Sequence, residues 1–474
     1  MILPAGRADS AAPANSRPME ISELYKVFKS CGRVSTDSRT VRGGELFFAL
    51  KGENFDGNKF APKALEAGAA YAVVSERLAD DGRFILVDDT LETLKALARY
   101  HREHILVDGK PMPVIGLTGT NGKTTTKELI RCVLAVKYRV SATVGNFNND
   151  IGVPLTLLSI PENCEIAVVE MGASHPDDIA HLVSVCEPDY GLITNVGKAH
   201  LLGFGSFEGV CKAKGQLYDY IKEHGRAVFV NSTDSVLNDM ASERGLPVIP
   251  YGAGAEVLPS DAAHPYLRLL VPDENGRRLL LQTQLVGSYN AANVLAAIAI
   301  GFHFGIPVAA ATDAIAAYEP ANKRSQMVKT ARNTLIVDAY NANPTSMAAA
   351  LDNFQNIDAP LKALLLGNMG ELGEDSLKEH VALLRRLKAE YAASPPPVVF
   401  LVGSEFRRAI DTLESSEPVA PTSKASADEP DLRFSCFPTS DDLAAGLSAN
   451  PLTGYTILIK GSRSTQMEKV IPVL

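Results

Sequence analysis

The sequence has few cysteines for its length, and they are not arranged for a disulfide framework or a zinc site. The six cysteines in 474 residues are widely scattered, and none forms a CxxC pair. Such a distribution is typical of reduced thiols in a reducing compartment. We therefore expect no structural disulfide and a cytoplasmic location.

Long apolar runs are also missing. No run reaches the roughly 20 residues that a membrane-spanning helix needs, so we expect no membrane insertion. Residues 1–18 are rich in Ala and Pro but lack a basic segment followed by an apolar one. We interpret them as a flexible tail rather than a signal peptide.

No basic tract stands out. The 46 Lys and Arg residues against 55 Asp and Glu give a net charge of −9, which argues against a dedicated nucleic-acid binder. An anionic ligand must then be held by local basic residues or backbone amides. The apolar share of 46% is that of a globular protein, and 474 residues correspond to about three domains at roughly 150 residues each.

The pattern along the chain predicts an α/β protein with three domains. Residues 19–112 mix strand-like runs (45–50 and 84–87) with helix-like stretches (61–67 and 91–104), which indicates a small α/β domain. Two prolines in the segment 109–113 predict a linker.

Residues 113–322 alternate apolar runs with helical patterns, which predicts a parallel, doubly wound sheet. Residues 285–318 read as one or two helices, followed by a polar link at 319–326. Residues 323–474 alternate again and predict a third α/β domain, with a low-complexity loop at 414–430. The expected strands of the two larger domains are 114–117, 166–169, 190–194, 227–230, 335–337, 363–366, 398–402 and 456–459.

The strongest local signal is an apolar strand that leads into a glycine-rich turn and a helix. In this turn the backbone amides can point at phosphate oxygens, Lys123 can neutralise the phosphates, and the Thr124 hydroxyl can bind Mg²⁺. Leu117 stands where the generic P-loop pattern has its first glycine. The alternative is a plain strand-to-helix turn that binds no phosphate, for which Gly119 and Gly122 alone would suffice. The phosphate-binding segment comprises Thr118, Gly119, Thr120, Asn121, Gly122, Lys123, Thr124 and Thr125.

Two further strands end in side chains suited to a metal site. Glu170 ends one apolar strand and His200 follows the next, and the carboxyl ends of parallel strands meet at one edge of the sheet. We expect both beside Thr124, although either side chain alone could be structural. Lys212 and Lys214 could simply line a solvated helix face, and the turn containing Asn148 and Asn149 could bind a polar ligand or be only a turn.

Several segments together resemble the Mur ligases, the ATP-dependent amide-forming enzymes of peptidoglycan precursor synthesis. The resemblance implies an N-terminal UDP-binding domain, a central ATP-binding domain and a C-terminal Rossmann-like domain. The segments are GTNGKTTT (119–126), NFNNDIGVP (146–154), EMGAS (170–174), TNVGKAHLLGFGS (194–206), KAKG (212–215), GSYNAANVLAA (287–297), DAYNANPTSM (338–347), LGNMGELG (366–373) and KGSR (460–463).

Within this family, the segments DAYNANPTSM and GNMGELG are similar to the member that adds D-alanyl-D-alanine to UDP-N-acetylmuramoyl-tripeptide. The DNPR-type signature of the tripeptide-forming members is missing. Folylpolyglutamate synthases share the fold but are not expected to carry the DAYNANP and KGSR pair. Another Mur-type step, or a P-loop ATPase of regulatory or transport type, is the alternative.

The resemblance implies roles for individual residues. Lys123, Lys214 and His200 are the expected catalytic residues, and Thr124, Glu170, His200 and a carbamylated Lys214 (N6-carboxylysine) would bind one or two Mg²⁺ ions. Carbamylation needs a neutral amine, hence a lysine with a lowered pKa. The expected ATP contacts beyond the phosphate-binding segment are Asn290, Asn293, Arg324, Asp338, Tyr340 and Asn341.

The UDP-linked substrate and D-alanyl-D-alanine are the expected partners of a monomeric enzyme. Two departures from the family pattern stand out: Tyr289 replaces a common His, and Gln216 replaces a common Glu. The Tyr289 departure leaves open which residues contact adenine, and the Gln216 departure leaves open which side chains support the metal site. The expected UDP-substrate residues are Ser38, Arg39, Lys51, Gly52, Asn54, Asn148 and Asn149, and the D-alanyl-D-alanine side is expected at Lys460, Ser462 and Arg463.

Overall fold

The computed structural model describes residues 19–260, 264–320, 324, 326–391, 396–416 and 432–474. These residues belong to two compact units: Met1–Pro111 with Pro154–Ile160, and Met112–Val153 with Pro161–Leu474. The predicted tail (1–18) and most of the predicted low-complexity loop (417–430) lie outside the described residues, as do residues 321–323 and 325 of the predicted link.

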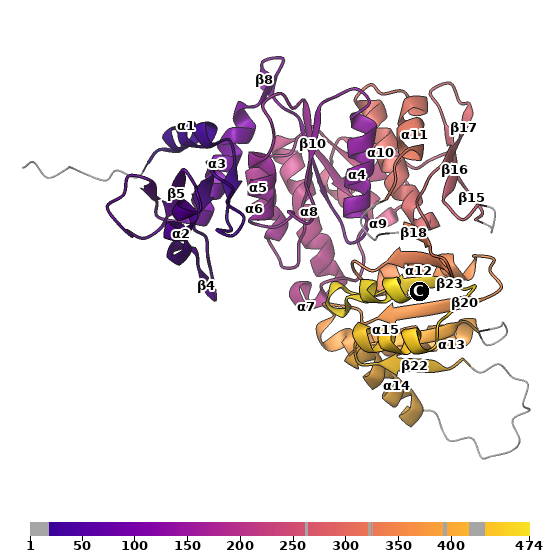
Figure 1. The fold of residues 1–474 in the computed structure, drawn as a ribbon. Coiled ribbons are helices and arrows are strands. Elements are labelled where there is room, and N and C mark those ends of the chain that lie inside the picture. Colours follow the sequence, from indigo (N-terminus) through magenta and orange to yellow (C-terminus); the bar gives the residue numbers. More distant parts are fainter. Residues whose placement is uncertain (1–18, 261–263, 321–323, 325, 392–395, 417–431) are drawn as a thin grey trace, which may run out of the picture. The chain divides into compact units, whose positions relative to one another are not determined.

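The N-terminal unit is built on a four-stranded parallel sheet of order β1-β2-β5-β6. Figure 1 draws this part of the chain in indigo and labels its strand β5 and its helices α1, α2 and α3. Phe47, Leu65 and Val74 pack in its core. The predicted strands and helices of this domain are confirmed. The elements are α1 (Ile21–Cys31), β1 (Val34–Ser35), β2 (Leu46–Phe48), β3 (Lys51–Gly52), β4 (Phe55–Asp56), α2 (Ala61–Glu66), β5 (Tyr71–Val74), β6 (Phe84–Leu86), α3 (Thr90–His104), β7 (Leu106–Val107) and β8 (Lys110–Pro111).

A buried histidine ties the segment Pro154–Ile160 to the rest of this unit. His101 of α3 is 3% exposed. Its Nε2 donates to the backbone oxygen of Ile160 at 2.9 Å, and its Nδ1 accepts from the Tyr25 hydroxyl at 3.1 Å. Burial lowers the pKa of His101, so the neutral ring is the form that makes both bonds.

The predicted linker at 109–113 overlaps a short antiparallel hairpin that β7 and β8 form. Its two-residue turn consists of Asp108 and Gly109, with φ values of 51° and 74°. An Asp-Gly turn with two positive φ angles matches the twist of a hairpin. Pro111 is tolerated because this ribbon has only two strands, and both are edges.

The central sheet is parallel throughout, with the order β10-β11-β9-β12-β13-β14. The predicted parallel sheet and its strands are thereby confirmed. The strands are β9 (Val114–Thr118), β10 (Val140–Ala142), β11 (Ile166–Glu170), β12 (Tyr190–Ile193), β13 (Ala227–Asn231) and β14 (Val248–Tyr251). The helices are α4 (Lys123–Leu134), α5 (Gly152–Leu158), α6 (Asp178–Cys186), α7 (Leu201–Phe204), α8 (Phe207–His224), α9 (Ser235–Arg244), α10 (Ala291–His303) and α11 (Val308–Ala316).

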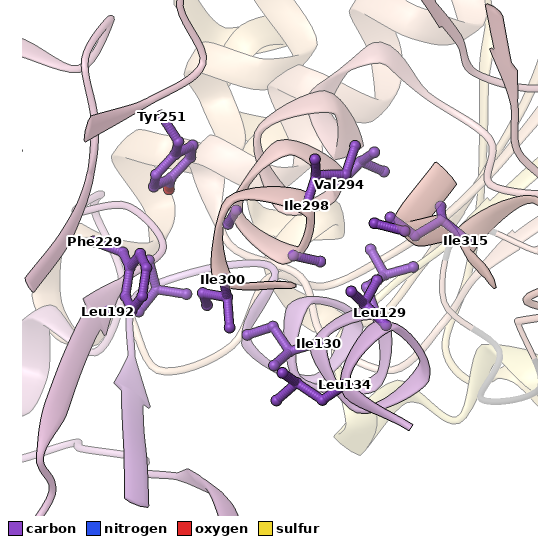
Figure 2. Packing of buried hydrophobic residues seen from close by; sticks show 14 of the residues in the cluster. Leu129, Ile130, Leu134, Leu192, Phe229, Tyr251, Val294, Ile298, Ile300 and Ile315 are labelled. Carbon is purple, nitrogen blue, oxygen red and sulfur yellow. The ribbon is translucent and has the colours of Figure 1, made fainter. Parts of the chain in front are cut away.

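The core of this part lies where α4, α10 and α11 pack together and against the sheet (Figure 2). Leu129 and Ile130 of α4 meet Ile298 of α10 and Ile315 of α11 there. A Cβ on Gly301 of α10 would lie 2.3 Å from a Val133 methyl, so glycine allows the two helices to approach closely. This packing fixes the helix that follows the glycine-rich turn.

A small antiparallel sheet was not predicted. It consists of β15 (Glu256–Leu258), β16 (Arg268–Pro272) and β17 (Arg278–Gln282). Buried and half-buried residues alternate along β16, which is the period of a strand with one face packed.

The C-terminal sheet has the order β18-β19-β23-β20-β21-β22, and only the edge strand β18 is antiparallel. The predicted strands of this domain are confirmed. Residues 414–416 of the predicted loop instead end helix α14. The elements are β18 (Gln326–Lys329), β19 (Thr334–Asp338), α12 (Pro344–Gln355), β20 (Lys362–Gly367), α13 (Ser376–Glu390), β21 (Val398–Val402), α14 (Ser404–Ser416), β22 (Phe434–Phe437), α15 (Ser440–Ala449) and β23 (Thr456–Lys460).

All six cysteines are free, as predicted. Within the described ranges, no helix combines the length and apolar character needed to cross a membrane.

Candidate active site

The glycine-rich turn lies between the end of β9 and the start of α4, as predicted. Lys123 Nζ donates to the backbone oxygens of Gly119 (2.7 Å) and Thr120 (3.2 Å), so its ammonium lies on the turn itself. The turn is also fixed to the end of β12, because Thr194 Oγ1 donates to the Asn121 oxygen at 2.6 Å and Asn195 Oδ1 accepts from the Asn121 amide at 3.0 Å.

Two positions of this turn accept only glycine. Gly119 and Gly122 have φ values of 149° and 78°. A Cβ on Gly119 would lie 1.9 Å from Thr194 Oγ1, and one on Gly122 would lie 2.6 Å from Asn293 Oδ1. The backbone therefore approaches its neighbours as closely as a phosphate-binding turn requires.

A buried carboxylate next to the turn links three segments. Glu170 at the end of β11 is 1% exposed. Its oxygens accept from the Thr124 hydroxyl at 3.0 Å and from Asn148 Nδ2 at 2.9 Å. The Glu170 amide donates to Thr143 Oγ1 at 2.9 Å. The expected neighbours Thr124 and Glu170 are thus in contact, and Asn148 joins them.

The Thr143 backbone is held from the other side by a lysine that sequence analysis missed. Lys127, on α4, is fully buried. Its Nζ donates to the Thr143 oxygen and pairs with Glu128 at 2.9 Å. The sequence alone does not distinguish a lysine that is buried on a helix from one that lies at the surface.

His200 makes its polar contact with a residue of the C-terminal sheet domain. His200 Nδ1 lies 2.6 Å from Glu371 Oε2, and this hydrogen bond lowers the pKa of Glu371. Glu371 was not predicted, although it lies in the segment LGNMGELG. Among the described residues, no group of three or more His, Cys, Asp and Glu side chains is placed to hold a metal ion, so any ion here needs further oxygen ligands.

Lys214 of α8 is 2% exposed and donates from Nζ to the Gly119 oxygen at 3.1 Å. Burial, with the charge of Lys123 beside it, holds the pKa of Lys214 well below its usual value. Burial also lowers the pKa of Lys123. Two lysines thus converge on the carbonyl of Gly119, and both have a lowered pKa.

The unusual Gln216 has a defined structural role. Its Oε1 accepts from the Ala180 amide at 3.1 Å, and its Nε2 donates to Asp177 Oδ1 at 2.7 Å. The side chain therefore joins α8 to the start of α6.

Asn290 and Asn293 are buried at the start of α10 and bond to each other at 3.0 Å.

In the C-terminal sheet, two residues expected to have separate roles form one ion pair. Lys460 Nζ lies 2.5 Å from Asp338 Oδ2 and 3.2 Å from the Asn341 oxygen. Asp338 and Lys460 are register partners at the ends of β19 and β23, and Lys460 is 1% exposed. Its ammonium is therefore bound within the protein.

Asn343, which was not predicted, connects this sheet to the glycine-rich turn. Its Oδ1 accepts from the Ser346 amide at 2.8 Å and caps α12. Its Nδ2 donates to Asn121 Oδ1 at 2.9 Å. Its neighbour Asn341 accepts from the Ala342 amide at 2.9 Å.

The side chains of Arg324 and Arg463 both lie against the ring of Tyr340, with guanidinium carbons 3.8 and 6.0 Å from its centre. These three residues line a cavity of about 530 Å³. The other lining residues are Thr124, Glu128, Arg131, Ala142, Thr143, Val144, Gly145 and Asn146.

Four of the five expected UDP-substrate residues of the N-terminal unit are exposed, and Ser38 is buried. Arg39 forms a two-pronged pair with Asp37, which lowers the pKa of Asp37 to about 2. Lys51 pairs with Glu76 at 2.6 Å. Ser38 lies between Asp37 and Arg39 in the chain, and Gly52 and Asn54 lie on the β3–β4 hairpin. Asn149, in the other unit, accepts from the Gly152 amide at 2.8 Å.

Three family models match the chain in succession: the Mur ligase family catalytic domain over residues 32–102, the Mur ligase middle domain over 117–301, and the Mur ligase glutamate ligase domain over 323–463. The chain is also 34% identical over 451 residues to the UDP-N-acetylmuramoyl-tripeptide--D-alanyl-D-alanine ligase of Bacillus subtilis, covering 92% of each chain. The chain belongs to the Mur ligase family. This Mur ligase is an ATP-dependent ligase with the expected three-domain α/β architecture.

Solved structures agree with this assignment. MurF from Acinetobacter baumannii is 28% identical and superposes with a TM-score of 0.79 over 96% of this chain and 99% of that chain. A second structure from that organism is named UDP-N-acetylmuramoylalanyl-D-glutamyl-2,6-diaminopimelate--D-alanyl-D-alanyl ligase. It is 27% identical, with a TM-score of 0.77 over 97% of this Mur ligase and 99% of its own chain.

Proposed function

We propose that this Mur ligase joins D-alanyl-D-alanine to UDP-N-acetylmuramoyl-tripeptide at the expense of ATP. The observation that carries the proposal is the convergence of Lys123 and the buried Lys214 on the Gly119 carbonyl. This phosphate site lies in a chain that covers 92% of a relative named for this reaction. The product is the UDP-linked pentapeptide of peptidoglycan synthesis, formed in the cytoplasm by a monomer.

The reaction proceeds through an acyl phosphate. The terminal carboxylate of the tripeptide attacks the γ-phosphorus of ATP and displaces ADP. The amine of D-alanyl-D-alanine then attacks the acyl carbon, releases phosphate and loses a proton to give the amide. Phosphoryl transfer depends on positioning and charge neutralisation, and Lys123 at the start of α4 supplies both.

The same turn and the residues near it form the ATP site in this proposal. The backbone of Thr118 to Thr125 surrounds the phosphates in this proposal, with amides from the turn and from the first residues of α4. Asn293 lies beside Gly122 and is bonded to Asn290, and both are assigned to the adenine side. The C-terminal domain adds Arg324, Asp338, Tyr340 and Asn341.

The oxygen atoms near the phosphate site suit Mg²⁺. The ion prefers oxygen ligands and usually takes only one or two from protein, with phosphates and water completing its shell. The Thr124 hydroxyl and the Glu170 carboxylate already lie in contact, and His200 is the further ligand proposed. When bound, Mg²⁺ supplies positive charge to the phosphate oxygens.

Carbamylation of Lys214 would add an anionic oxygen ligand. Its amine must be neutral to attack CO₂, forming an N–C bond while the amine loses a proton. The lowered pKa of Lys214 supports that protonation state. The negative charge of the carbamate would also be attracted by the charge of Lys123, which lowers the pKa of Lys214.

The two remaining substrates are assigned to the outer domains. Ser38, Arg39, Lys51, Gly52 and Asn54 of the N-terminal unit are assigned to the UDP end. Asn148 and Asn149 remain separate candidates for contacts to the UDP-linked substrate. Ser462 and Arg463 serve the D-alanyl-D-alanine side, and Lys460 supports them through its pair with Asp338. We propose domain limits at 19–112, 113–322 and 323–474.

The deciding experiment measures phosphate release from ATP and Mg²⁺ with UDP-N-acetylmuramoyl-tripeptide, with and without D-alanyl-D-alanine. We expect release to require both substrates, together with a heavier UDP-linked product by mass spectrometry. Release without an amine acceptor would indicate a regulatory or transport ATPase. Release with a single amino acid acting on a shorter UDP-peptide would indicate another Mur-type step.

A further inference from the structure

Lys127 is a buried lysine to which the proposed reaction assigns no role. It lies on α4, one helical turn beyond Lys123, and is 0% exposed. Its Nζ donates to the backbone oxygen of Thr143 and lies 2.9 Å from Glu128 Oε1. Burial opposes ionisation of Glu128, but hydrogen bonds from Lys127 and Arg131 outweigh it and lower the pKa of that carboxyl. Lys127 and Glu128 therefore form an ion pair inside the protein.

A charged group is an expensive choice for this position. Taking an ammonium group out of water is costly even when a carboxylate accompanies it, and apolar side chains of similar size often serve stability equally well. Packing on α4 therefore does not require a lysine at position 127. The ammonium group supplies one thing that an apolar side chain cannot, which is the hydrogen bond to the Thr143 carbonyl.

Thr143 begins the loop that holds the carboxylate of Glu170. It follows β10 directly, is 1% exposed, and its Oγ1 accepts from the Glu170 amide at 2.9 Å. Further along the loop, Asn148 Nδ2 donates to Glu170 Oε1 at 2.9 Å. The Asn148 carbonyl accepts from the Gly172 amide at 2.7 Å. The loop thus contacts the backbone on both sides of the Glu170 side chain and the carboxylate itself.

The same helix carries both the partner of Glu170 and the lysine that holds this loop. Thr124 and Lys127 are three residues apart on α4, which places them on neighbouring turns of one face. The Thr124 hydroxyl donates to Glu170 Oε2 at 3.0 Å. Lys127 connects α4 to the loop, and the loop returns to Glu170 through Thr143. The bond from Lys127 therefore fixes the carboxylate relative to the Thr124 hydroxyl.

We propose that Lys127 is a positioning residue for the metal ligands of the active site. This inference rests on the proposed function, in which Thr124 and Glu170 bind Mg²⁺. Lys127 holds the Thr143 carbonyl, and Thr143 and its loop hold Glu170, so the carboxylate is oriented before an ion binds. Groups that orient metal ligands in this way typically contribute about tenfold to a hundredfold to metal affinity or activity.

The test replaces Lys127 by methionine, an unbranched and adaptable apolar side chain. Glu128 keeps Arg131 as a partner, with Arg131 Nε 2.9 Å from its Oε2, so the variant leaves no unpaired carboxylate in the interior. Binding of Mn²⁺ in the presence of ADP is followed by electron paramagnetic resonance, and ligation is measured over a range of Mg²⁺ concentrations.

We expect Lys127→Met to weaken Mn²⁺ binding by about tenfold to a hundredfold. The Mg²⁺ concentration that gives half-maximal activity should rise by the same factor, and kcat should largely recover at saturating Mg²⁺. KM for D-alanyl-D-alanine should stay unchanged. A general loss of structure would not produce this combination, because excess Mg²⁺ would not restore kcat.

Lys362→Met is the matched control. Lys362 lies on β20 of the C-terminal sheet, and its Nζ also donates to backbone oxygens, those of Phe354 at 3.3 Å and Gln355 at 3.0 Å. This variant loses the same kind of lysine-to-carbonyl bond away from the phosphate site. It should therefore keep the wild-type Mn²⁺ affinity.

Two substitutions at Thr143 test the next step of the same connection and serve if Lys127→Met does not fold. Thr143→Val keeps the shape of the side chain but removes the oxygen that accepts from the Glu170 amide, leaving a buried donor without its partner. Thr143→Ser keeps that oxygen. We expect the valine variant to bind Mn²⁺ weakly and the serine variant to bind it almost as the wild-type protein does.

Unchanged Mn²⁺ affinity in folded Lys127→Met would overturn the inference while leaving the ligase function intact. Equal Mn²⁺ binding by Thr143→Val and Thr143→Ser would overturn it as well, because Lys127 acts on Glu170 through Thr143. A wild-type protein that binds Mn²⁺ but releases no phosphate in response to D-alanyl-D-alanine would instead reject the proposed function, and the binding measurements would still decide the role of Lys127.

Discussion

His200 Nδ1 and Glu371 Oε2 lie 2.6 Å apart, and both residues have positive φ angles, 51° and 61°. Non-glycine residues adopt this conformation only when their surroundings compensate for its cost. The pair joins the loop after β12 to the loop after β20. In the proposed active site it fixes the ring of a metal-binding histidine, as carboxylates commonly do.

We therefore expect Glu371→Gln to lower kcat by about tenfold to a hundredfold with little change in KM for the UDP-linked substrate. The amide keeps the shape of the side chain but loses the charge that orients the ring. Binding of Mn²⁺ in the presence of a non-hydrolysable ATP analogue, followed by electron paramagnetic resonance, should weaken in parallel. Glu374→Gln changes an exposed carboxylate in the same segment and should have neither effect.

Lys214→Ala should abolish ligation, because it removes the amine that we propose is carbamylated. In CO₂-depleted buffer the wild-type enzyme should lose activity and recover it when bicarbonate is added, whereas the variant should not respond. Incorporation of ¹³C-bicarbonate, measured by carbon NMR, reports the carbamate directly. Normal turnover by Lys214→Ala would reject the carbamate, and Lys212→Ala on the same helix is the comparison variant.

Gly122→Ala should weaken ATP binding severely, because its Cβ would collide with Asn293 at 2.6 Å while the residue keeps a φ of 78°. Gly276→Ala is the matched control: Gly276 has a φ of 77°, but a Cβ at that position would meet no atom within 4 Å. The control should cost about 1 kcal/mol of stability with unchanged ATP affinity. Isothermal titration with ADP and thermal unfolding separate the two effects.

His380 should make the stability of the C-terminal domain depend on pH. This buried ring accepts from the Met369 amide at 3.0 Å and donates from Nδ1 to the Ser376 oxygen at 2.7 Å. Burial lowers its pKa in the folded protein, against the opposing charges of Glu405 and Glu379. As the pH falls through about 6.5, the unfolded chain therefore binds the proton first, and the free energy of unfolding falls.

The corresponding measurement compares melting temperatures at pH 7.5 and 5.5. We expect the wild-type protein to lose stability between these values and His380→Gln to lose less, because the variant has no imidazole to protonate. The variant should also be less stable at pH 7.5, since the Met369 amide loses its acceptor. An identical drop in both proteins would show that the ring is not the titrating group.

The phosphate-binding turn and the parallel strands could be located from the sequence, because each follows from a local pattern of apolar runs and glycines. Lys214 was singled out only through the resemblance to the Mur ligases, since its local pattern favours a solvated helix face, whereas the structure buries it. Glu371, Asn343 and Lys127 could not be located, since their roles depend on contacts between distant segments. The Asp338–Lys460 pair shows the same limit: sequence analysis found both residues but expected separate roles. The two residues are partners because of the register in which β19 pairs with β23. That register depends on the folded sheet and cannot be read from either strand alone.

The N-terminal unit is discontinuous, because Pro154–Ile160 belongs to it as well as Met1–Pro111. Its His101 would lose an acceptor, the Ile160 carbonyl, in any fragment that ends at residue 111. This unit is thus not a module that a single cut can transplant into another ligase. A chimaera that exchanges it must carry both segments, and a recombination joint placed only between the first two family-model regions would remove the Ile160 acceptor of its buried imidazole and leave only the bond from Tyr25.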